Sequence, residues 1–393
     1  MALTGESDGE PLASPARLAL AMDGWAAALA DRTAISGTRV EISGAELLAE
    51  RAAFAKLRRR GSSSAGGHCR LLPAADGWLA LSLARADDVE LLPAWLGSTA
   101  AADGSWSTVA DLVATRSRDD LLEGAGLLGI PCAGLGEVDA SRVPLVHDLA
   151  LAAGAAVQPL VGARVVDLSS LWAGPLCAHL LGLAGARVVK VEGRSRPDGA
   201  RLGPAAFYEL LHGGHESVVL DLGRAPGRDA LLRLLTGADI VIEASRPRAL
   251  AALGCAPEDA IAAGFDGVWV SITAFGRTGD AATRVGFGDD AAVGGGLVAW
   301  TAGRPVFVAD AVADPATGLL AALSAADALA RGWRGVTAVS LAATAAHLAA
   351  TIASGEPVRR VPPDVRVTPP RARTPTARAA EPGADTEAVL ASW

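Results

Sequence analysis

Two carboxylates, Asp310 and Asp314, stand in the segment VADAVADPATG at the start of a predicted helix. The pair Asp314-Pro315 fits a helix start, with aspartate as N-cap and proline at the first helical position. On the residues alone this structural interpretation is favoured over catalysis, although one does not exclude the other. The helix dipole would keep the carboxylate ionised, and an ionised carboxylate is a nucleophile toward an activated acyl group. Asp314 is therefore a candidate nucleophile, and Asp310 is its rival.

Arginines gather just past the ends of two predicted strands. They are Arg194, Arg196 and Arg201 after the strand 186–192, and Arg246 after the strand 238–244. Each one alone is better explained as part of a solvated rim. Together they lie at the carboxyl edge of the predicted sheet, where open α/β sheets bind ligands. Guanidinium groups match phosphate oxygens, so the cluster favours a polyphosphate ligand.

The turn after the first predicted strand, LWAGPLCAHL, has too few glycines to cradle a dinucleotide pyrophosphate, which disfavours NAD. The helix that follows can still attract a phosphate or hold a thioester carbonyl at its N-terminus. The stretch GFGDDAAVGGGL (286–297) is interpreted as a mobile glycine-rich loop over the sheet edge. His212 and His215 flank a Gly-Gly turn and are candidates to line the site, whereas His179 is expected to pack inside a helix.

The elements that must position these residues alternate between β-rich and helical patterns, which predicts a parallel sheet with helices on both faces. Helices are expected at 175–185, 226–235 and 315–332. The strands are expected at 163–168, 186–192, 217–222, 238–244 and 267–273, with a possible sixth at 304–310.

Four regions are predicted along the chain. A hairpin with Asp76-Gly77 at its turn is expected in the second region, the small α/β domain. In the first, LLAERAAFAKLRRR is expected to form a helix that runs into its three final arginines, and GSSSAGG (61–67) a flexible loop. The regions are a helical N-terminal segment (1–66), a small α/β domain (67–150), a large sheet domain (160–350) and an extended C-terminal arm (351–393).

Composition narrows the class of protein. The 393 residues carry a net charge of −8, and 51% of them are apolar. The acidity argues against a nucleic-acid partner, and no uncharged apolar run reaches the ~18 residues of a membrane helix. The beginning of the chain lacks the pattern of a secretory signal. The four cysteines form neither a CxxC pair nor a zinc-like spacing, so no metal site is predicted and a reducing cytoplasm is expected.

These residues together resemble the family III CoA-transferases, which include carnitine, bile-acid and formyl-CoA transferases and α-methylacyl-CoA racemase. The resemblance runs in order over about 160–330, through RVVDLSSLWAGPLCAHLLGLAGARVVKVE, DGAR, ADIVIEASRPRAL and VWVSITAFGRTGD. It implies a Rossmann-like large domain, a smaller α/β domain and a homodimer. The substrates it implies are an acyl-CoA and a small carboxylate, with no tightly bound cofactor.

The resemblance reverses the weighting at Asp314, because the family's nucleophilic aspartate stands four residues before a glycine, as Asp314 does before Gly318. It implies that Asp314 forms a mixed anhydride with the acyl group and then an aspartyl-CoA thioester. Together with the arginine cluster, it implies CoA contacts at Ala173, Gly174, Arg194, Arg201, Ser245, Arg246, Thr273, Phe275 and Gly276.

The chain also departs from the family pattern. The stretch that resembles the family's small domain (71–137) precedes the sheet domain instead of following it, so a permuted domain order is expected. Trp172 stands where formyl-CoA transferase has glutamine. Two other functions stay open. One is a racemase or isomerase using Asp314 with Asp289 or Glu243, although the loop 286–297 lacks the racemases' histidine. The other is a non-catalytic CoA-binding subunit.

Overall fold

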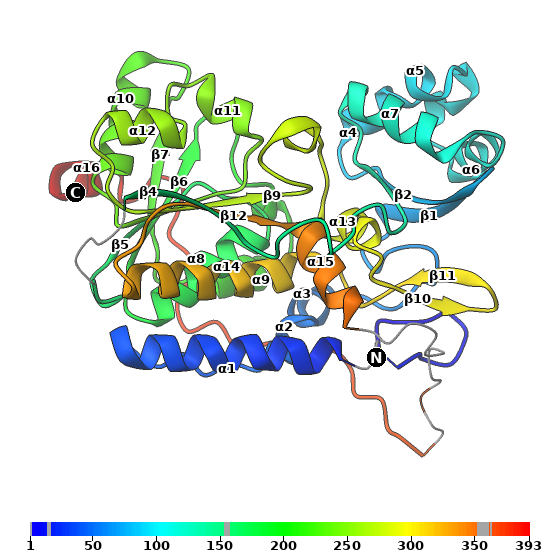
Figure 1. The fold of residues 1–393 in the computed structure, drawn as a ribbon, viewed down its shortest axis with the longest axis horizontal. Helices are drawn as coiled ribbons and strands as arrows, with labels where there is room; N and C mark the ends of the chain where they lie inside the picture. Colours follow the sequence, from blue (N-terminus) through cyan, green and yellow to red (C-terminus); the bar gives the residue numbers. More distant parts are fainter. Residues whose placement is uncertain (1, 14–16, 153–157, 352–360, 362–363) are drawn as a thin grey trace.

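A mostly parallel β-sheet forms the centre of the protein (Figure 1). The computed structural model describes residues 2–13, 17–152, 158–351, 361 and 364–393. All neighbouring strands of the sheet are parallel except β4 and β12. Its seven strands in spatial order are β4 (His147–Ala152), β12 (Arg334–Ser340), β9 (Val268–Thr273), β8 (Ile240–Glu243), β5 (Arg164–Asp167), β6 (Arg187–Gly193) and β7 (Glu216–Leu220).

Helices cover both faces of this sheet, because alternate residues of its strands are apolar on both sides. Val165 and Ile242 join one hydrophobic cluster, whereas their neighbours Val166 and Val241 join another. The predicted parallel sheet with helices on both faces is thereby confirmed. The first face carries α1 (Leu18–Ser36), α8 (Ala173–Leu183), α14 (Ala313–Ala330) and α15 (Leu341–Ala350), and the second carries α10 (Ala225–Thr236), α12 (Pro257–Ala262) and α16 (Thr386–Ser392).

The predicted sixth strand at 304–310 is wrong as a member of this sheet. Residues Arg304–Phe307 form β11, which pairs only with β10 (Val298–Thr301) in a separate antiparallel hairpin. The sixth parallel strand is instead β12, whose Val336 and Val339 are buried. Its sequence, RGVTAVS, mixes small and polar residues with two valines, so no strand was predicted there.

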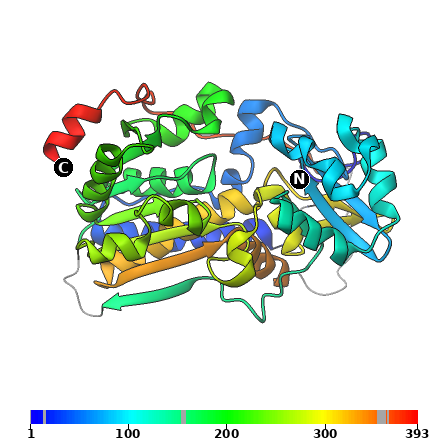
Figure 2. The same cartoon turned by 90° about the horizontal axis from the view of Figure 1, so that it is seen from above.

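A smaller unit lies beyond the carboxyl ends of the parallel strands (Figures 1 and 2). Its sheet is antiparallel, with β1 (Cys69–Ala74), β2 (Gly77–Ser82) and β3 (Cys132–Gly134) in that order. The predicted hairpin is confirmed, although Ala75 and Asp76 rather than Asp76 and Gly77 make its turn. A hydrophobic cluster of its own includes Leu79, Trp95 and Leu121. The helices are α4 (Ala86–Glu90), α5 (Leu92–Leu96), α6 (Trp106–Ala114) and α7 (Arg118–Leu128).

The N-terminal segment packs on the sheet domain. Helix α1 lies against α14, and the two share one hydrophobic cluster. The predicted helix through LLAERAAFAKLRRR is too long, because α3 (Glu50–Ala55) ends before Lys56, which adopts a left-handed φ of 54°. The arginines at 58–60 therefore lie outside the helix. The predicted flexible loop 61–67 is packed as well, since Ser64 is fully buried.

The described end of the C-terminal arm, residues 364–393, follows the surface of the sheet domain to its far end, where α16 lies beside β7 (Figure 2). Asp385 accepts a hydrogen bond from the Ser217 backbone N–H (2.8 Å). Arg373 pairs with the buried carboxylate of Glu50 (2.6 Å), so the arm also holds α3.

The remaining helices are α2 (Gly44–Leu47), α9 (Ala205–His212), α11 (Pro247–Ala251) and α13 (Gly288–Gly294), with short 3-10 turns at Thr99–Asp103, Gly199–Leu202 and Gly279–Thr283.

Candidate active site

Asp314 is half-buried in the first turn of α14, and its carboxylate lies against α13. Val312 takes the N-cap position, so the predicted capping role of Asp314 is wrong. A Cβ atom at Gly288 would collide with the Asp314 carboxylate and lie 2.6 Å from the Ala311 carbonyl oxygen. Glycine at 288 therefore permits the close approach of α13 to the carboxylate.

Arg51, in α3, supplies a positive charge to the carboxylates around Asp314. Its guanidinium forms a two-point ion pair with Asp310, with Nε 2.9 Å from Oδ2 and Nη2 2.5 Å from Oδ1. Asp310 is fully buried, whereas the Arg51 side chain is 32% exposed. The Arg51 guanidinium also lies 5.3 Å from the ring centre of Trp172. Asp310 is therefore a structural partner of Arg51, and Asp314 remains the more accessible carboxylate.

The turn that carries Asp310 is backbone-strained. Ala309 and Ala311, on either side of it, adopt left-handed φ angles of 56° and 42°, a conformation that costs a non-glycine residue about 1–3 kcal/mol. Each is held by a hydrogen bond from its backbone N–H, Ala309 to the Thr4 hydroxyl (3.2 Å) and Ala311 to the Asp289 carboxylate (3.0 Å). Strain of this kind collects where a site fixes the direction of its side chains.

Burial raises the pKa of Asp314 to about 7; Arg51 opposes this shift, while the carboxylates of Asp289, Asp310 and Asp290 add to it. The pKa of Asp289 is likewise raised, to about 6, by burial and by Asp310. The sequence-based expectation that the helix dipole holds Asp314 ionised is therefore incomplete. Burial and neighbouring acids outweigh the dipole, and Asp314 gains or loses its proton near neutral pH.

The predicted mobile loop 286–297 is wrong over most of its length, because α13 occupies 288–294. Asp290, buried in this helix, accepts hydrogen bonds from the Ser82 hydroxyl (2.7 Å) and from the Phe287 N–H (3.0 Å). Burial raises its pKa to about 7, and the bond from Ser82 opposes the shift. Because Ser82 belongs to β2, these contacts fix α13 between the small unit and Asp314.

Ala173 and Gly174 open α8 and are buried beside the first turns of α14. A Cβ atom at Gly318 would lie 2.5 Å from the Ala173 carbonyl oxygen, so the two helices approach most closely through a glycine. Gly318, the glycine four residues after Asp314, thus has a packing reason. It places the start of α8 beside the helix that carries Asp314.

A buried ion cluster holds the turn that leads into α8. Lys190, only 2% exposed, lies 3.6 Å from Asp167 and 3.1 Å from Asp198 and donates to the Ser169 carbonyl. Asp198 also accepts from the N–H of Leu171 (3.0 Å), whose φ is 71°. Burial opposes the Lys190 charge, but the two carboxylates outweigh it and raise the pKa of the lysine. The Lys190 ammonium group thus stabilises the turn that leads into α8.

The residues predicted to contact CoA follow the carboxyl ends of the strands, but several already form ion pairs or hydrogen bonds within the protein. Arg201 pairs with Glu192 (3.0 Å) and covers the Tyr208 ring. The Ser245 N–H donates to Glu243 (2.7 Å), while Arg194 is exposed. The buried Thr273 hydroxyl has no hydrogen-bond partner within the described chain. Beyond β9, the Phe275 ring packs under Arg284, and Gly276 adopts a φ of 149°.

Arg246 lies at the boundary with the small unit. The Arg85 Nη2 donates to the Gly129 carbonyl (3.1 Å), and a Cβ atom at Gly129 would lie 3.9 Å from Nη1 of Arg246. Burial and the charges of Arg248, Arg85 and Arg196 lower the pKa of Arg246. Cations from both parts of the molecule thus meet at the edge where the sequence predicted a polyphosphate.

The histidines form a buried group rather than a surface of the site. His179, His212 and His215 are each less than a tenth exposed and lie ring against ring. Burial lowers the pKa of His179 to about 3 and that of His215 to about 4, so both are neutral at pH 7. His179 packs inside α8 as predicted, and burial leaves His212 and His215 no exposed surface to offer a substrate.

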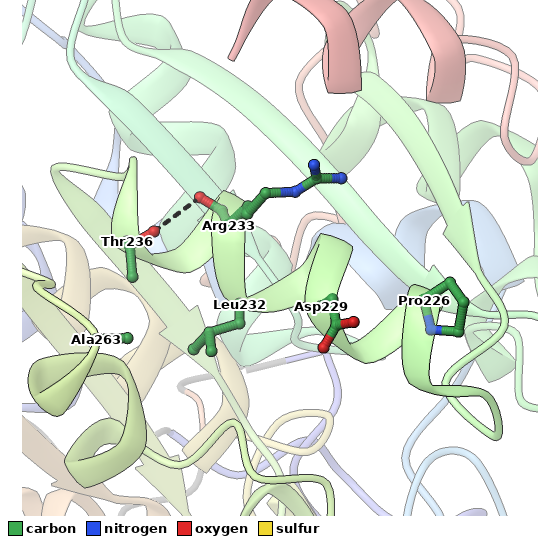
Figure 3. A pocket seen from close by; sticks show the side chains of 6 residues that line it. All are labelled: Pro226, Asp229, Leu232, Arg233, Thr236 and Ala263. Atoms are coloured by element: carbon green, nitrogen blue, oxygen red, sulfur yellow. Dashed lines mark hydrogen bonds between the residues drawn. The ribbon is translucent and has the colours of Figure 1, made fainter.

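A surface depression lies elsewhere, on the outer side of α10 and α12 (Figure 3). Within it the Thr236 hydroxyl donates to the Arg233 carbonyl (3.1 Å). It contains none of the predicted site residues, and its polar side chains do not converge on a point. Its lining is Pro226, Asp229, Leu232, Arg233, Thr236 and Ala263.

In the described part of the chain, no His, Cys, Asp and Glu cluster could hold a metal ion, and no helix could span a membrane.

The sequence matches CoA-transferase family III over residues 160–369, more than half of the chain. The chain belongs to this family. Its similarity to family members is moderate. It is 30% identical over 182 residues to a succinyl-CoA–D-citramalate CoA-transferase of Chloroflexus aurantiacus, covering 44% of this chain and 45% of that protein. It is 35% identical over 179 residues to a succinate–glutarate CoA-transferase of Agrobacterium fabrum, covering 41% and 44%.

A solved structure, that of the hypothetical protein Rv3272 of Mycobacterium tuberculosis, aligns at a TM-score of 0.46 and 30% identity, covering 50% of this chain and 59% of that one. The chain spans less than half the length of the curated relatives it matches. The family match includes Asp314 and the sheet edge. Arg51 and Arg85 lie outside it, in the first 159 residues.

Arg51 and Arg85 are also the residues that sequence reasoning missed. Arg51 lies 259 positions from its partner Asp310 in the sequence. Its surroundings, LLAERAAF, predict only a helix. The one available signal was an arginine next to Glu50, a carboxylate that is buried by the C-terminal arm.

Proposed function

We propose that this protein is an acyl-CoA:carboxylate CoA-transferase whose nucleophile is Asp314. The observation that carries this proposal is the state of the Asp314 carboxylate. It is half-buried, accepts no hydrogen bond from any described residue, and lies close enough to Arg51 for the guanidinium to oppose its protonation. A carboxylate without hydrogen-bond donors keeps its lone pairs available for attack on an acyl carbon.

The reaction needs no external base. A carboxylate oxygen of Asp314 attacks the thioester carbonyl carbon, the C–S bond breaks, and the CoA thiolate leaves a mixed anhydride. The thiolate then attacks the Asp314 carbonyl carbon and expels the donor carboxylate, which leaves an aspartyl-CoA thioester. The acceptor carboxylate repeats the two steps in reverse order. Asp314 returns to its carboxylate, and no proton is gained or lost.

The arginines at the sheet edge support a CoA site there. Its phosphates would lie against Arg246 and the arginines around it, where like charges stand close together without a full set of counter-ions. Its pantetheine arm would pass Ala173 and Gly174 toward Asp314. The engagement of Arg201 with Glu192 makes Arg246 the better candidate for direct phosphate contact. The expected homodimer, permuted domain order and cytoplasmic location remain predictions.

The alternative racemase function is less well supported. Glu243, one of its two candidate partners, is fully engaged by the Ser245 N–H, the Ser271 hydroxyl and Arg277. Asp289 lies near Asp314, but one of its carboxylate oxygens accepts a hydrogen bond from the Ala311 N–H. The arrangement therefore offers no pair of free groups on opposite sides of a substrate carbon.

The test is exchange of label between an acyl-CoA and its free carboxylate. The wild-type protein should catalyse exchange, and Asp314→Asn and Asp314→Ala should lower the rate roughly 10³-fold or more, as expected for a nucleophile. Asp266→Asn, an exposed aspartate, is the matched control. Persistent exchange in folded Asp314 variants would overturn the proposal. Deuterium entry from solvent at the acyl α-carbon without an acceptor would indicate the racemase, and CoA binding without turnover would indicate the non-catalytic subunit.

A further inference from the structure

One edge of the Arg51 guanidinium is unused. Its Nε and Nη2 atoms donate to the two oxygens of Asp310. No described residue accepts a hydrogen bond from Nη1. The Arg51 side chain is 32% exposed, so it is not sealed from solvent. The indole of Trp172, itself buried, lies near the guanidinium and limits how that ligand can enter.

The surroundings of Arg51 are strongly acidic. Asp289 and Asp290 on α13, Asp310 before α14 and Asp314 within it all act on one another or on Arg51. Glu50, next to Arg51, is turned toward Arg373 instead. Arg51 is the cation with the strongest effect on Asp314. An anionic co-substrate that approached Asp314 without using Arg51 would meet carboxylates of its own sign.

We propose that Arg51 binds the carboxylate of the acceptor through Nη1 and so determines that the acceptor is a carboxylate. This role rests on the proposed function. A guanidinium donates to carboxylate oxygens with well-matched geometry, and the Asp310 pair already fixes its orientation. Asp310 is then a positioning residue, which holds Nε and Nη2 of the guanidinium and leaves Nη1 for the acceptor.

The experiment compares a charged acceptor with an uncharged one. Acyl transfer to a carboxylate and to hydroxylamine is measured in the wild type and in Arg51→Gln, Arg51→Lys and the double variant Arg51→Gln/Asp310→Asn. Assays at about pH 8.5 lie above the wild-type pKa of Asp314 of about 7. Loss of Arg51 raises that pKa, and because protonation of Asp314 slows transfer to both acceptors alike, the ratio of the two rates isolates the effect on the acceptor. Arg142→Gln is the matched control, because that arginine is 84% exposed and pairs only loosely with Asp139 (3.5 Å).

Arg51→Gln should raise the KM for the carboxylate roughly 10- to 100-fold, the range for one lost hydrogen bond to a charged group. The KM for acyl-CoA should change less than about threefold, and hydroxamate formation should fall much less than carboxylate transfer. The double variant is the control for misfolding, because it also removes the buried Asp310 charge that Arg51 neutralises. It should keep the full carboxylate defect, and Arg51→Lys should recover part of it.

Two results would overturn the role of Arg51. One is an equal loss with carboxylate and hydroxylamine; the other is a normal carboxylate KM in the double variant, which would make Arg51 only a counter-ion for Asp310. Failure of the proposed function looks different. A wild-type protein that forms no hydroxamate from any acyl-CoA tested would remove the function and the role of Arg51 together.

Discussion

Replacing Asp289 by asparagine should shift the pH profile of the reaction without removing the reaction. The pKa of Asp314 is about 7, raised by burial and by its acidic neighbours, Asp289 first among them. Asparagine keeps an acceptor for the Ala311 N–H, a bond that spans 3.0 Å from the Asp289 oxygen. The substitution therefore removes one negative charge with little change of shape, and the pKa of Asp314 should fall by about one unit.

The direction follows from the form that reacts. Because Asp314 must be ionised to attack, the rate rises with pH through its pKa, and a lower pKa moves the rise toward acid. At pH 6 the ionised fraction would grow from about a tenth to about a half, a roughly fivefold gain in kcat/KM, with no gain at about pH 8.5. The assay is initial transfer from an acyl-CoA with an uncharged acyl group over about pH 5 to 9.

Asp266→Asn is measured alongside, so that titration of the substrate phosphates cancels in the comparison. A midpoint that stays in place, or moves toward alkaline pH, would refute the electrostatic reasoning. A complete loss of transfer at every pH would instead assign Asp289 a direct part in the chemistry.

Two further substitutions test how the site is held. Gly288→Ala places a methyl group against the Asp314 carboxylate; we expect at least a tenfold loss of kcat, on the order of one displaced catalytic contact, whereas Gly126→Ala, which meets nothing within 4 Å, should leave initial rates unchanged. Lys190→Met leaves Asp167 and Asp198 buried without their shared cation; urea unfolding should show a loss of about 3–5 kcal/mol, and a loss below about 1 kcal/mol would show that the cluster is not held by charge.

The sheet could be predicted from the sequence because its inner strands are short runs of valine and isoleucine between turn signals. The stretches 163–168, 186–192 and 238–244 need burial on both faces, and that pattern is local. The strand at 334–340 lacks such a run, and its burial depends on pairing with β9 and β4. A strand defined by its neighbours in space leaves little trace in its own residues.

The start of α14 shows a second limit. Asp314-Pro315 has the residue types of a helix cap, yet the helix begins two residues earlier than that pattern indicates. The cause is the strained turn around Asp310, where Ala309 and Ala311 take left-handed conformations that alanine rarely adopts. The hydrogen bonds that hold this turn come from Thr4 and Asp289, which are distant in sequence. Local propensity could not anticipate them.

The location of Arg51 bears on which part of the chain defines the chemistry. The family match includes Asp314, the proposed nucleophile, and the edge proposed to bind CoA, whereas Arg51 comes from α3, outside that match. The arm residue Arg373 fixes α3 through Glu50, and Ser82 of the small unit fixes α13 through Asp290. Because the field at Asp314 is set by Arg51 against Asp289, Asp290 and Asp310, a change in the N-terminal region alters both the pKa of the nucleophile and the access of an anion to it. Under the proposed mechanism, the sheet domain supplies the nucleophile and the first 66 residues determine which acceptors reach it.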